Sequence, residues 1–237
     1  MPRAELETLF GRLRHAARTG QGLSVISPGT AARLLGHDAL TLCLATPRGQ
    51  LELLWCDDAA DRLGPVLDDL QYTLGEGPSL DAIRTGRTVT EPDLATTPAG
   101  VWPLFLPAAA RTPVRAVMAV PLRLGVVSLG VLTAYRIRPG APSGQQTEAT
   151  DRFARAALSL LLNTAPARLL TGEHGAGLAL HRAEVHQATG VLAVQLRIAL
   201  DEALLRLRAH AYSHDRALLD VARDVIAHRI RLDNSTP

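Results

Sequence analysis

The chain has 237 residues, a length that allows one large domain or two small ones. Hydrophobic residues make up 47% of it but aromatic residues only 3%, so the core must be built mainly from Leu, Val and Ala. All basic residues are arginines and the formal net charge is only +2, which excludes a uniformly basic nucleic-acid-binding protein and restricts any such binding to a local patch.

The N-terminal part predicts two helices. Residues 4–18 form an amphipathic helix whose apolar stripe has no evident partner in the sequence; the stripe comprises Leu6, Leu9, Phe10 and Leu13. A turn at Ser27–Thr30 leads into a short second helix, with Thr30 as its N-cap and Gly36 as its stop.

A sheet pattern follows. Residues 39–45 alternate in polarity, residues 47–49 predict a turn and residues 51–55 return as a second strand, which together indicate a hairpin. The later elements are predicted as helices at 61–70, from Pro78 to a stop at Gly86, and at 145–163, strands at 88–90, 116–122 and 128–135, and a loop at 98–107. This mixed order predicts an antiparallel α+β domain rather than βαβ repeats.

Three motifs within this region carry a family resemblance. They are LGEGPSLDAIRTGRTVTEPDL from Leu74, then Trp102, then VRAVMAVPLRLGVVSLGVLTAYR from Val114. Together they resemble the GAF family of small-molecule-sensing domains. The resemblance implies an antiparallel sheet flanked by helices over residues 25–163, preceded by a separate helix within residues 1–24. It also implies a pocket between sheet and loops, where Tyr72, Trp102 and Phe105 are candidate lining residues for an unknown small-molecule or protein signal.

No cofactor or metal is expected. The Asn-Lys-Phe-Asp-Glu pattern of the cyclic-nucleotide-binding GAF subgroup is absent, and Gly75–Gly77 matches no phosphate-binding motif. His37 is a lone histidine near the sheet and is interpreted as a core or surface residue. Cys43 and Cys56 lie in strand-like runs without metal-ligand spacing, so they are interpreted as inert thiols.

Catalytic motifs are also absent from the sequence. There is no Gly-x-Ser-x-Gly or His-Glu-x-x-His pattern, and the adjacent Asp57 and Asp58 are interpreted as a solvated turn. The chain is therefore predicted not to be an enzyme. It shows no signal-peptide pattern and no apolar run of about 18 residues, which favours a cytoplasmic protein without a membrane partner.

A Pro- and Gly-containing stretch at 164–179 is the predicted linker. Beyond it, residues 180–232 carry apolar positions at three- and four-residue steps, which predicts amphipathic helices. So many apolar positions require these helices to pack on one another or on a partner.

The C-terminal segment carries a second resemblance. HQATGVL from His186, Ala203, Leu207, Arg208, Ala211 and LDVA from Leu219 are spaced as in the ANTAR family, which comprises three-helix RNA-binding modules that act as transcription antiterminators. The resemblance implies three helices at about 180–194, 200–212 and 216–230 and a structured stem-loop RNA as partner. The candidate RNA-binding residues are Gln187, Thr189, Gly190, Arg206, Arg208, Asp215, Arg216 and Arg223.

Other interpretations of these residues remain open. Residues 179–237 hold eight Arg against seven carboxylates, so the arginines can instead be a solvated face that pairs with acids; the candidate acids are Asp201, Glu202, Asp220 and Asp224. Ala188 and Gly190 are small enough to serve close helix packing, and Asp215 can cap the third helix. Thr189 stands where the family has Lys, which removes a charge from a position expected near RNA.

The connection between the first two helices also departs from the family. Arg197 and Ala199 replace its Gly and Ser/Thr, so the two helices could run as one continuous or kinked helix.

Two functional hypotheses follow. The first is a signal-responsive antiterminator in which a GAF sensor controls an ANTAR bundle, as a homodimer paired through the helices at 4–18 and 145–163. The alternative is a sensor or scaffold whose helical tail mediates dimerisation or protein docking without RNA binding.

Overall fold

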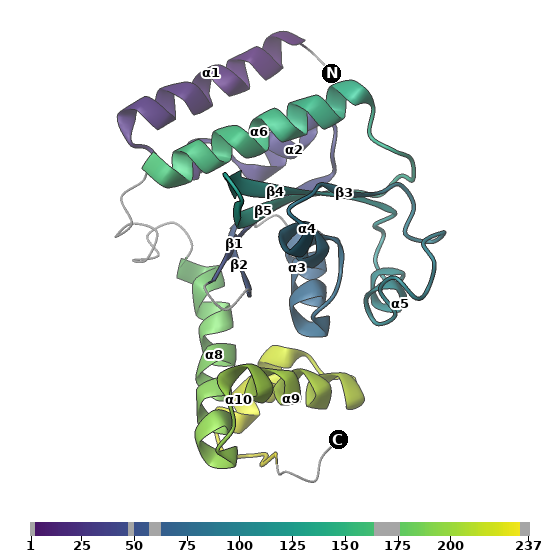
Figure 1. Cartoon of the computed structure of the whole chain (residues 1–237), viewed down its shortest axis with the longest axis vertical. Helices are drawn as coiled ribbons and strands as arrows, with labels where there is room; N and C mark the ends of the chain where they lie inside the picture. Colours follow the sequence, from purple (N-terminus) through teal and green to yellow (C-terminus); the bar gives the residue numbers. More distant parts are fainter. Residues whose placement is uncertain (1–2, 47–49, 57–62, 164–175, 233–237) are drawn as a thin grey trace. The chain divides into compact units, whose positions relative to one another are not determined.

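The computed structural model describes residues 3–46, 50–56, 63–163 and 176–232, which fall into two compact units, Met1–Gly175 and Ala176–Pro237 (Figure 1). Three expectations lie outside the described residues: the turn at 47–49, the solvated pair Asp57 and Asp58, and most of the linker at 164–179.

The N-terminal unit is built on a five-stranded sheet with the order β2-β1-β5-β4-β3. Its strands are β1 (Ala39–Ala45), β2 (Leu51–Cys56), β3 (Val89–Glu91), β4 (Ala116–Leu124) and β5 (Val127–Arg136). Every neighbouring pair is antiparallel, including the predicted β1–β2 hairpin. The antiparallel α+β fold class is confirmed.

Helices cover both faces of this sheet (Figure 1). On one face lie α1 (Arg3–Thr19), α2 (Pro28–Leu35) and α6 (Gly144–Asn163), and on the other lie α3 (Leu63–Leu74), α4 (Pro78–Thr85) and α5 (Phe105–Ala109). The two-residue period of a strand supplies both layers. On β5, Leu132 and Ala134 join the core under α6, whereas Tyr135 joins the core under α3.

The apolar stripe of α1 is buried within its own unit. Leu9, Phe10 and Leu13 are at most 3% exposed and belong to the same core cluster as Phe153 of α6. Arg152 of α6 also lies 3.9 Å above the Phe10 ring. The prediction that the helices at 4–18 and 145–163 have unpartnered stripes for a dimer is therefore wrong, because each helix covers the other.

Two local predictions are also wrong. The N-cap of α2 is Ser27, whose hydroxyl accepts the Thr30 N–H at 3.2 Å, so the helix begins at Pro28 rather than after Thr30. The expected loop at 98–107 contains the start of α5. The carboxylate of Glu76 accepts the Phe105 N–H at 2.7 Å and so satisfies the start of that helix from a distant part of the chain.

Candidate functional site

The C-terminal unit is a three-helix bundle formed by α8 (Ala176–Leu196), α9 (Leu200–Ser213) and α10 (Leu218–Ile226). All three helices pack on one another. Their shared core is apolar and less than 6% exposed, and comprises Val185, Ala188, Leu192, Ala203, Leu204, Leu207, Ala211, Leu218, Val221, Ala222 and Val225. The predicted periodicity therefore builds a bundle with a core of its own.

The first two helices are separate. Arg197 follows α8 with a left-handed φ of 56°, and the Ile198 N–H donates to the Ala193 carbonyl at 3.1 Å. This hydrogen bond closes the helix end although no glycine is present. The two separate helices are confirmed, and the alternative of one continuous or kinked helix is wrong, because Arg197 ends α8 in a left-handed conformation. This conformation costs a non-glycine residue roughly 1–2 kcal/mol.

All three helices end in this way, each with a left-handed residue other than glycine; these are Arg197, Asp215 and His228. After α9, the Arg216 N–H donates to the Ala211 carbonyl at 2.9 Å. Asp215 therefore belongs to the end of α9. The N-cap of α10 is Ala217, whose side chain forms no cap hydrogen bond, and Asp215 lies two residues before it.

Arg223 links α10 to α8. Its guanidinium donates to the Glu184 carboxylate at 3.0 Å and lies 3.7 Å from that of Asp220. Gln187 is exposed and lies one turn beyond Glu184 on α8, so the bundle brings Gln187 and Arg223 to the same side. Both are candidates from the sequence.

A second charged group surrounds Asp224. Its carboxylate accepts hydrogen bonds from Arg216 and Arg229, each at 2.6 Å. Hydrogen bonding to Arg216, and next to Arg229, lowers the pKa of Asp224 below its usual value. Arg216 and Arg229 thus share one carboxylate. Arg216 was a candidate from the sequence, and Arg229 was not.

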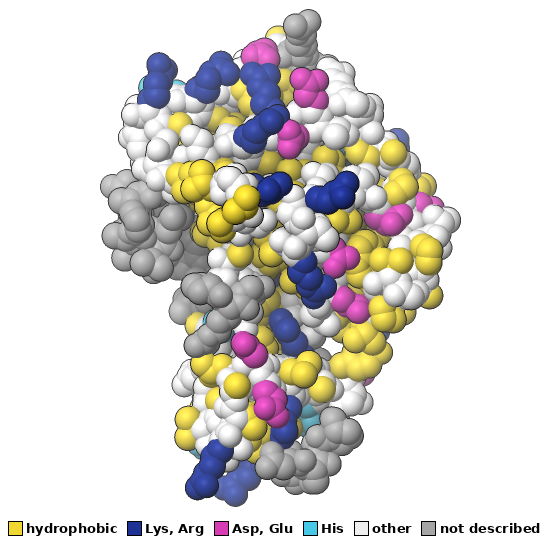
Figure 2. Space-filling model, viewed as in Figure 1, with side chains coloured by type: hydrophobic (Ala, Val, Ile, Leu, Met, Phe, Trp, Pro, Cys, Tyr) yellow, Lys and Arg dark blue, Asp and Glu magenta, His cyan; other side chains and the backbone are white. Residues whose placement is uncertain are grey.

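On α9, Arg206 pairs with Glu202 one turn away at 3.0 Å, while Arg208 is half-buried. These and the preceding ion pairs match the interpretation of the arginines as partners of nearby acids in the free protein. In the part of Figure 2 that shows this unit, basic and acidic side chains are interspersed.

Sequence reasoning missed a histidine pair at the end of α9. The rings of His210 and His214 stack with their centroids 4.0 Å apart. Burial, and then the positive charges of His214 and Arg216, lower the pKa of His210. The four-residue spacing of the two histidines on a helix was the available signal.

One side of α8 carries the exposed Gln187 and Val194 and, between them, the half-buried Gly190; we call this side the outer face of α8. A Cβ added to Gly190 would meet no atom within 4 Å, so the packing interpretation holds for the fully buried Ala188 and fails for Gly190. Thr189 does not project from the helix as expected. It is 5% exposed and its hydroxyl donates to the Val185 carbonyl at 2.7 Å.

Gly190 therefore weakens α8 without a packing reason, which leads to a prediction. The Gly190→Ala variant should raise the free energy of unfolding of the bundle by about 0.5–1 kcal/mol, because alanine loses less backbone entropy in a helix. Thermal unfolding followed by circular dichroism at 222 nm measures the change. A variant less stable than the wild type would contradict it and restore a packing role for the glycine.

The three sensor candidates lie on the α3 side of the sheet. Tyr72, Trp102 and Phe105 are 6%, 3% and 0% exposed, and the last two rings meet edge to face at 6.0 Å. The indole N–H of Trp102 donates to Asp81 at 2.9 Å. Trp102 and Phe105 are thus packed as core residues.

A buried polar cluster lies beneath the same face of the sheet. Gln71 donates to the Tyr135 hydroxyl at 3.2 Å and accepts the Ser79 N–H at 2.7 Å, and the Ser79 and Thr133 hydroxyls lie 2.8 Å apart. Burial raises the pKa of Tyr135. Sequence reasoning did not find this cluster, because its members come from separate elements and each is an ordinary polar residue.

His37 is a core histidine. It is 6% exposed, and its Nε2 lies 2.9 Å from the Thr150 hydroxyl. No group of three or more His, Cys, Asp or Glu side chains suited to a metal ion occurs among the described residues. In the same ranges, no helix combines the length and apolar character needed to cross a membrane.

Comparisons with known proteins agree with the two units. Residues 179–226 match the model of the ANTAR domain family. The phycoerythrobilin-bound GAF domain of a cyanobacterial phytochrome has a TM-score of 0.51 at 16% identity, over 67% of this chain and 95% of that one. The GAF domain of the Acinetobacter phosphoenolpyruvate-protein phosphotransferase has a TM-score of 0.50 at 15% identity, over 68% of this chain and 95% of that one. A comparison with curated proteins gave no match.

At these identities the structural neighbours establish the fold of the N-terminal unit and nothing about its ligand. The family match covers α9 and α10 entirely and most of α8. The chain therefore joins an N-terminal domain of GAF fold to a C-terminal three-helix bundle that matches the ANTAR domain family over residues 179–226.

Proposed function

We propose that this protein is a signal-responsive transcription antiterminator whose C-terminal bundle binds a structured stem-loop RNA, and that it is not an enzyme. The observation that carries the proposal is the ANTAR match over 179–226, whose residues fold as a three-helix bundle with its own core. By stabilising one form of a nascent RNA, the bundle would exclude a terminator hairpin. Recognition would use loop bases and backbone shape.

The ion pairs of the free bundle shape this proposal. Arg216 and Arg223 are held by carboxylates, so an RNA phosphate would replace an acid as the arginine's partner. Such an exchange gains less than binding by unpaired arginines, which makes affinity depend on geometry rather than on bulk charge. The pair formed by Arg223 and Glu184 is the better candidate for exchange, because both side chains are more than a third exposed.

The outer face of α8 adjoins this pair. Gln187 offers an amide to a base edge, and the open space at Gly190 lets a nucleotide approach the helix backbone. Exposed Tyr212 on α9 is an additional candidate for stacking on an unpaired base, although it was not singled out from the sequence.

Two substitutions of opposite sign test the proposal. Arg223→Gln should weaken binding of a paired stem-loop RNA by about tenfold, because a charge-assisted hydrogen bond is lost, and should reduce the salt slope by about one. Glu184→Gln should tighten binding by up to about fivefold, because it releases Arg223 from the closer of its two acids and leaves only Asp220. Fluorescence anisotropy of labelled RNA at several salt concentrations measures both effects.

Arg33→Gln is the matched control, because Arg33 is exposed on α2 in the other unit and its loss changes the net charge equally. Its affinity should equal that of the wild type. Saturable RNA binding with the same affinity for the wild type and all three variants would place the RNA interface elsewhere on the bundle. Non-saturable binding by every variant would overturn RNA recognition itself.

Exposed apolar side chains on the bundle favour the second candidate function, protein docking or dimerisation. Val194, Leu205 and Tyr212 are 80%, 64% and 57% exposed. A homodimer also remains part of the first proposal, since two bundles would gain effective concentration on a paired-hairpin target. Sedimentation of the full chain and of Leu205→Ser distinguishes the candidates. A dimer that Leu205→Ser dissociates, together with no saturable RNA binding, supports the second.

The input to the GAF-fold domain is proposed to be a small molecule or a protein. The α3 side of the sheet, which holds Tyr72, Trp102 and Phe105 as well as the buried polar cluster, is the proposed receiving surface.

A further inference from the structure

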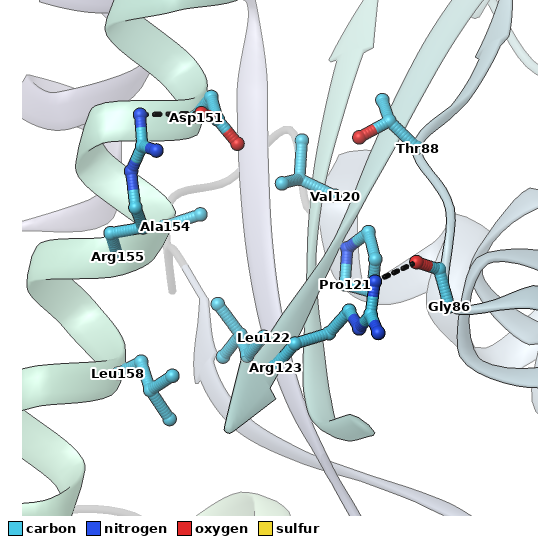
Figure 3. A pocket seen from close by; sticks show the side chains of 10 residues that line it. All are labelled: Gly86, Thr88, Val120, Pro121, Leu122, Arg123, Asp151, Ala154, Arg155 and Leu158. Atoms are coloured by element: carbon cyan, nitrogen blue, oxygen red, sulfur yellow. Dashed lines mark hydrogen bonds and ion pairs between the residues drawn. The ribbon is translucent and has the colours of Figure 1, made fainter. Parts of the chain in front are cut away.

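The α6 side of the sheet holds a hollow of about 280 Å³ (Figure 3). It exists because β3 pairs with β4 only over Val117–Ala119, so the following residues of β4 have no strand on that side among the described residues. The small side chain of Ala154 on α6 leaves room above them. This hollow lies on the opposite face of the sheet from the proposed receiving surface of the sensor.

The floor of the hollow is apolar. It is formed by Val120, Pro121 and Leu122 of β4, with Ala154 and Leu158 from α6 as the opposing wall. Except for half-buried Pro121, these side chains are at most 8% exposed. The hollow therefore suits a molecule that combines a compact apolar group with polar atoms.

Two arginines stand on opposite sides of this floor (Figure 3). Arg123 donates to the Gly86 carbonyl at 3.1 Å, and Arg155 pairs with Asp151 at 2.6 Å. The partner of Arg123 is a neutral carbonyl, so its charge is not compensated by an acid among the described lining residues. With Asp151 as the one acidic lining residue, the lining carries a net positive charge.

An added strand is a poor occupant for this open part of β4. Proline has no N–H to donate to a neighbouring strand, and a charged side chain at a sheet edge disfavours pairing. Pro121 and Arg123 supply both features. A volume at the lower end of the ~300–1,000 Å³ typical of ligand pockets instead fits a small molecule.

We propose that this hollow is a binding site for a small organic anion, a carboxylate or phosphate carrying a compact apolar group. The apolar group would lie on Val120 and Leu122, and the anion would bind the guanidinium of Arg123 at the mouth, with Arg155 opposite. The site is independent of RNA binding and of the α3 face.

The test is protein-observed NMR on the full chain with benzoate, hexanoate and phenyl phosphate as probes, beside benzamide and hexanamide as neutral counterparts. At least one anion should give saturable shifts of the amides of Val120, Leu122 and Arg123 and of residues 154–158, and its neutral counterpart should bind at least about tenfold more weakly. Arg123→Gln should weaken the anion by about tenfold, and Ala154→Leu should abolish its binding by filling the hollow.

The matched control is again Arg33→Gln, which should bind the probe as the wild type does. Spectral dispersion shows whether the Ala154→Leu variant is folded. If that variant is unfolded, the Arg123→Gln variant alone decides the test. The proposal is overturned if no anion saturates these amides at about 10 mM, a concentration that detects even millimolar affinity. Equal binding by the neutral amides, or equal loss in the control, would overturn it as well.

Discussion

The Gly130→Ala variant should lose about 3 kcal/mol of the free energy of unfolding of the N-terminal domain, because it overpacks the centre of the sheet. Gly130 lies on β5 between β1 and β4, opposite Leu44 and Leu122. A Cβ at this position would lie far inside van der Waals contact with the backbone carbonyl oxygen of Cys43. That carbonyl belongs to β1, which is flanked by a strand on each side, so relief requires a shift of the sheet itself.

Urea denaturation followed by tryptophan fluorescence measures this loss, since both tryptophans, Trp55 and Trp102, belong to the N-terminal domain. Gly100→Ala is the matched control, because a Cβ there meets no atom within 4 Å. Its free energy of unfolding should stay within about 0.5 kcal/mol of the wild type. Equal unfolding midpoints for the two variants would show that β5 can move away from β1 at little cost.

Elements with a strong local pattern could be predicted from the sequence. The predicted and observed bounds of the β-strands agree within a residue or two, as for β1 at Ala39–Ala45. A strand alternates apolar and polar side chains along consecutive residues, so a short stretch of sequence is enough to predict it. The glycine stops at Gly36 and Gly86 were also correct, and both are left-handed. In contrast, α5 depends on Glu76, which lies far from it in the sequence, so local pattern could not reveal it.

The candidate site was predicted less completely. Residue types were identified, but ion pairs across helices, such as that of Arg223 with Glu184, depend on how α8 and α10 pack. The burial of Thr189 could have been predicted, since Thr189 lies four residues after the buried Val185 and therefore on the same side of the helix. Because Thr189 faces inward, its difference from the family's Lys bears little on the charge of the outer face of α8.

The hollow beside α6 could not be predicted, because it results from the shortness of β3. The three-residue strand β3, Val89–Glu91, leaves part of β4 without a neighbouring strand on that side among the described residues. The residues at 88–90 predict a strand, but they do not indicate where its pairing with β4 ends. The two arginines that flank the hollow come from β4 and α6, which meet only in the folded domain.

Acidification should destabilise the N-terminal domain through His37. Burial, aided by the charge of Arg136 and opposed by that of Asp38, lowers the pKa of His37 to about 4. In the unfolded chain the pKa is about 6.5, so between these values the unfolded state binds more protons. The free energy of unfolding should therefore be unaffected by His37 above about pH 6.5 and fall by about 3 kcal/mol as the pH drops to 4.

Urea denaturation at a series of pH values, compared with His37→Gln, isolates this contribution from that of the carboxylates. Glutamine can still form a hydrogen bond with the Thr150 hydroxyl but does not titrate, so the variant should lose less stability than the wild type between pH 6.5 and 4. His15→Gln, at an exposed position on α1, is the matched control for the loss of one histidine. If His37→Gln and the wild type lose stability in parallel, then His37 is protonated in the folded domain at little cost, and its burial does not exclude the charge.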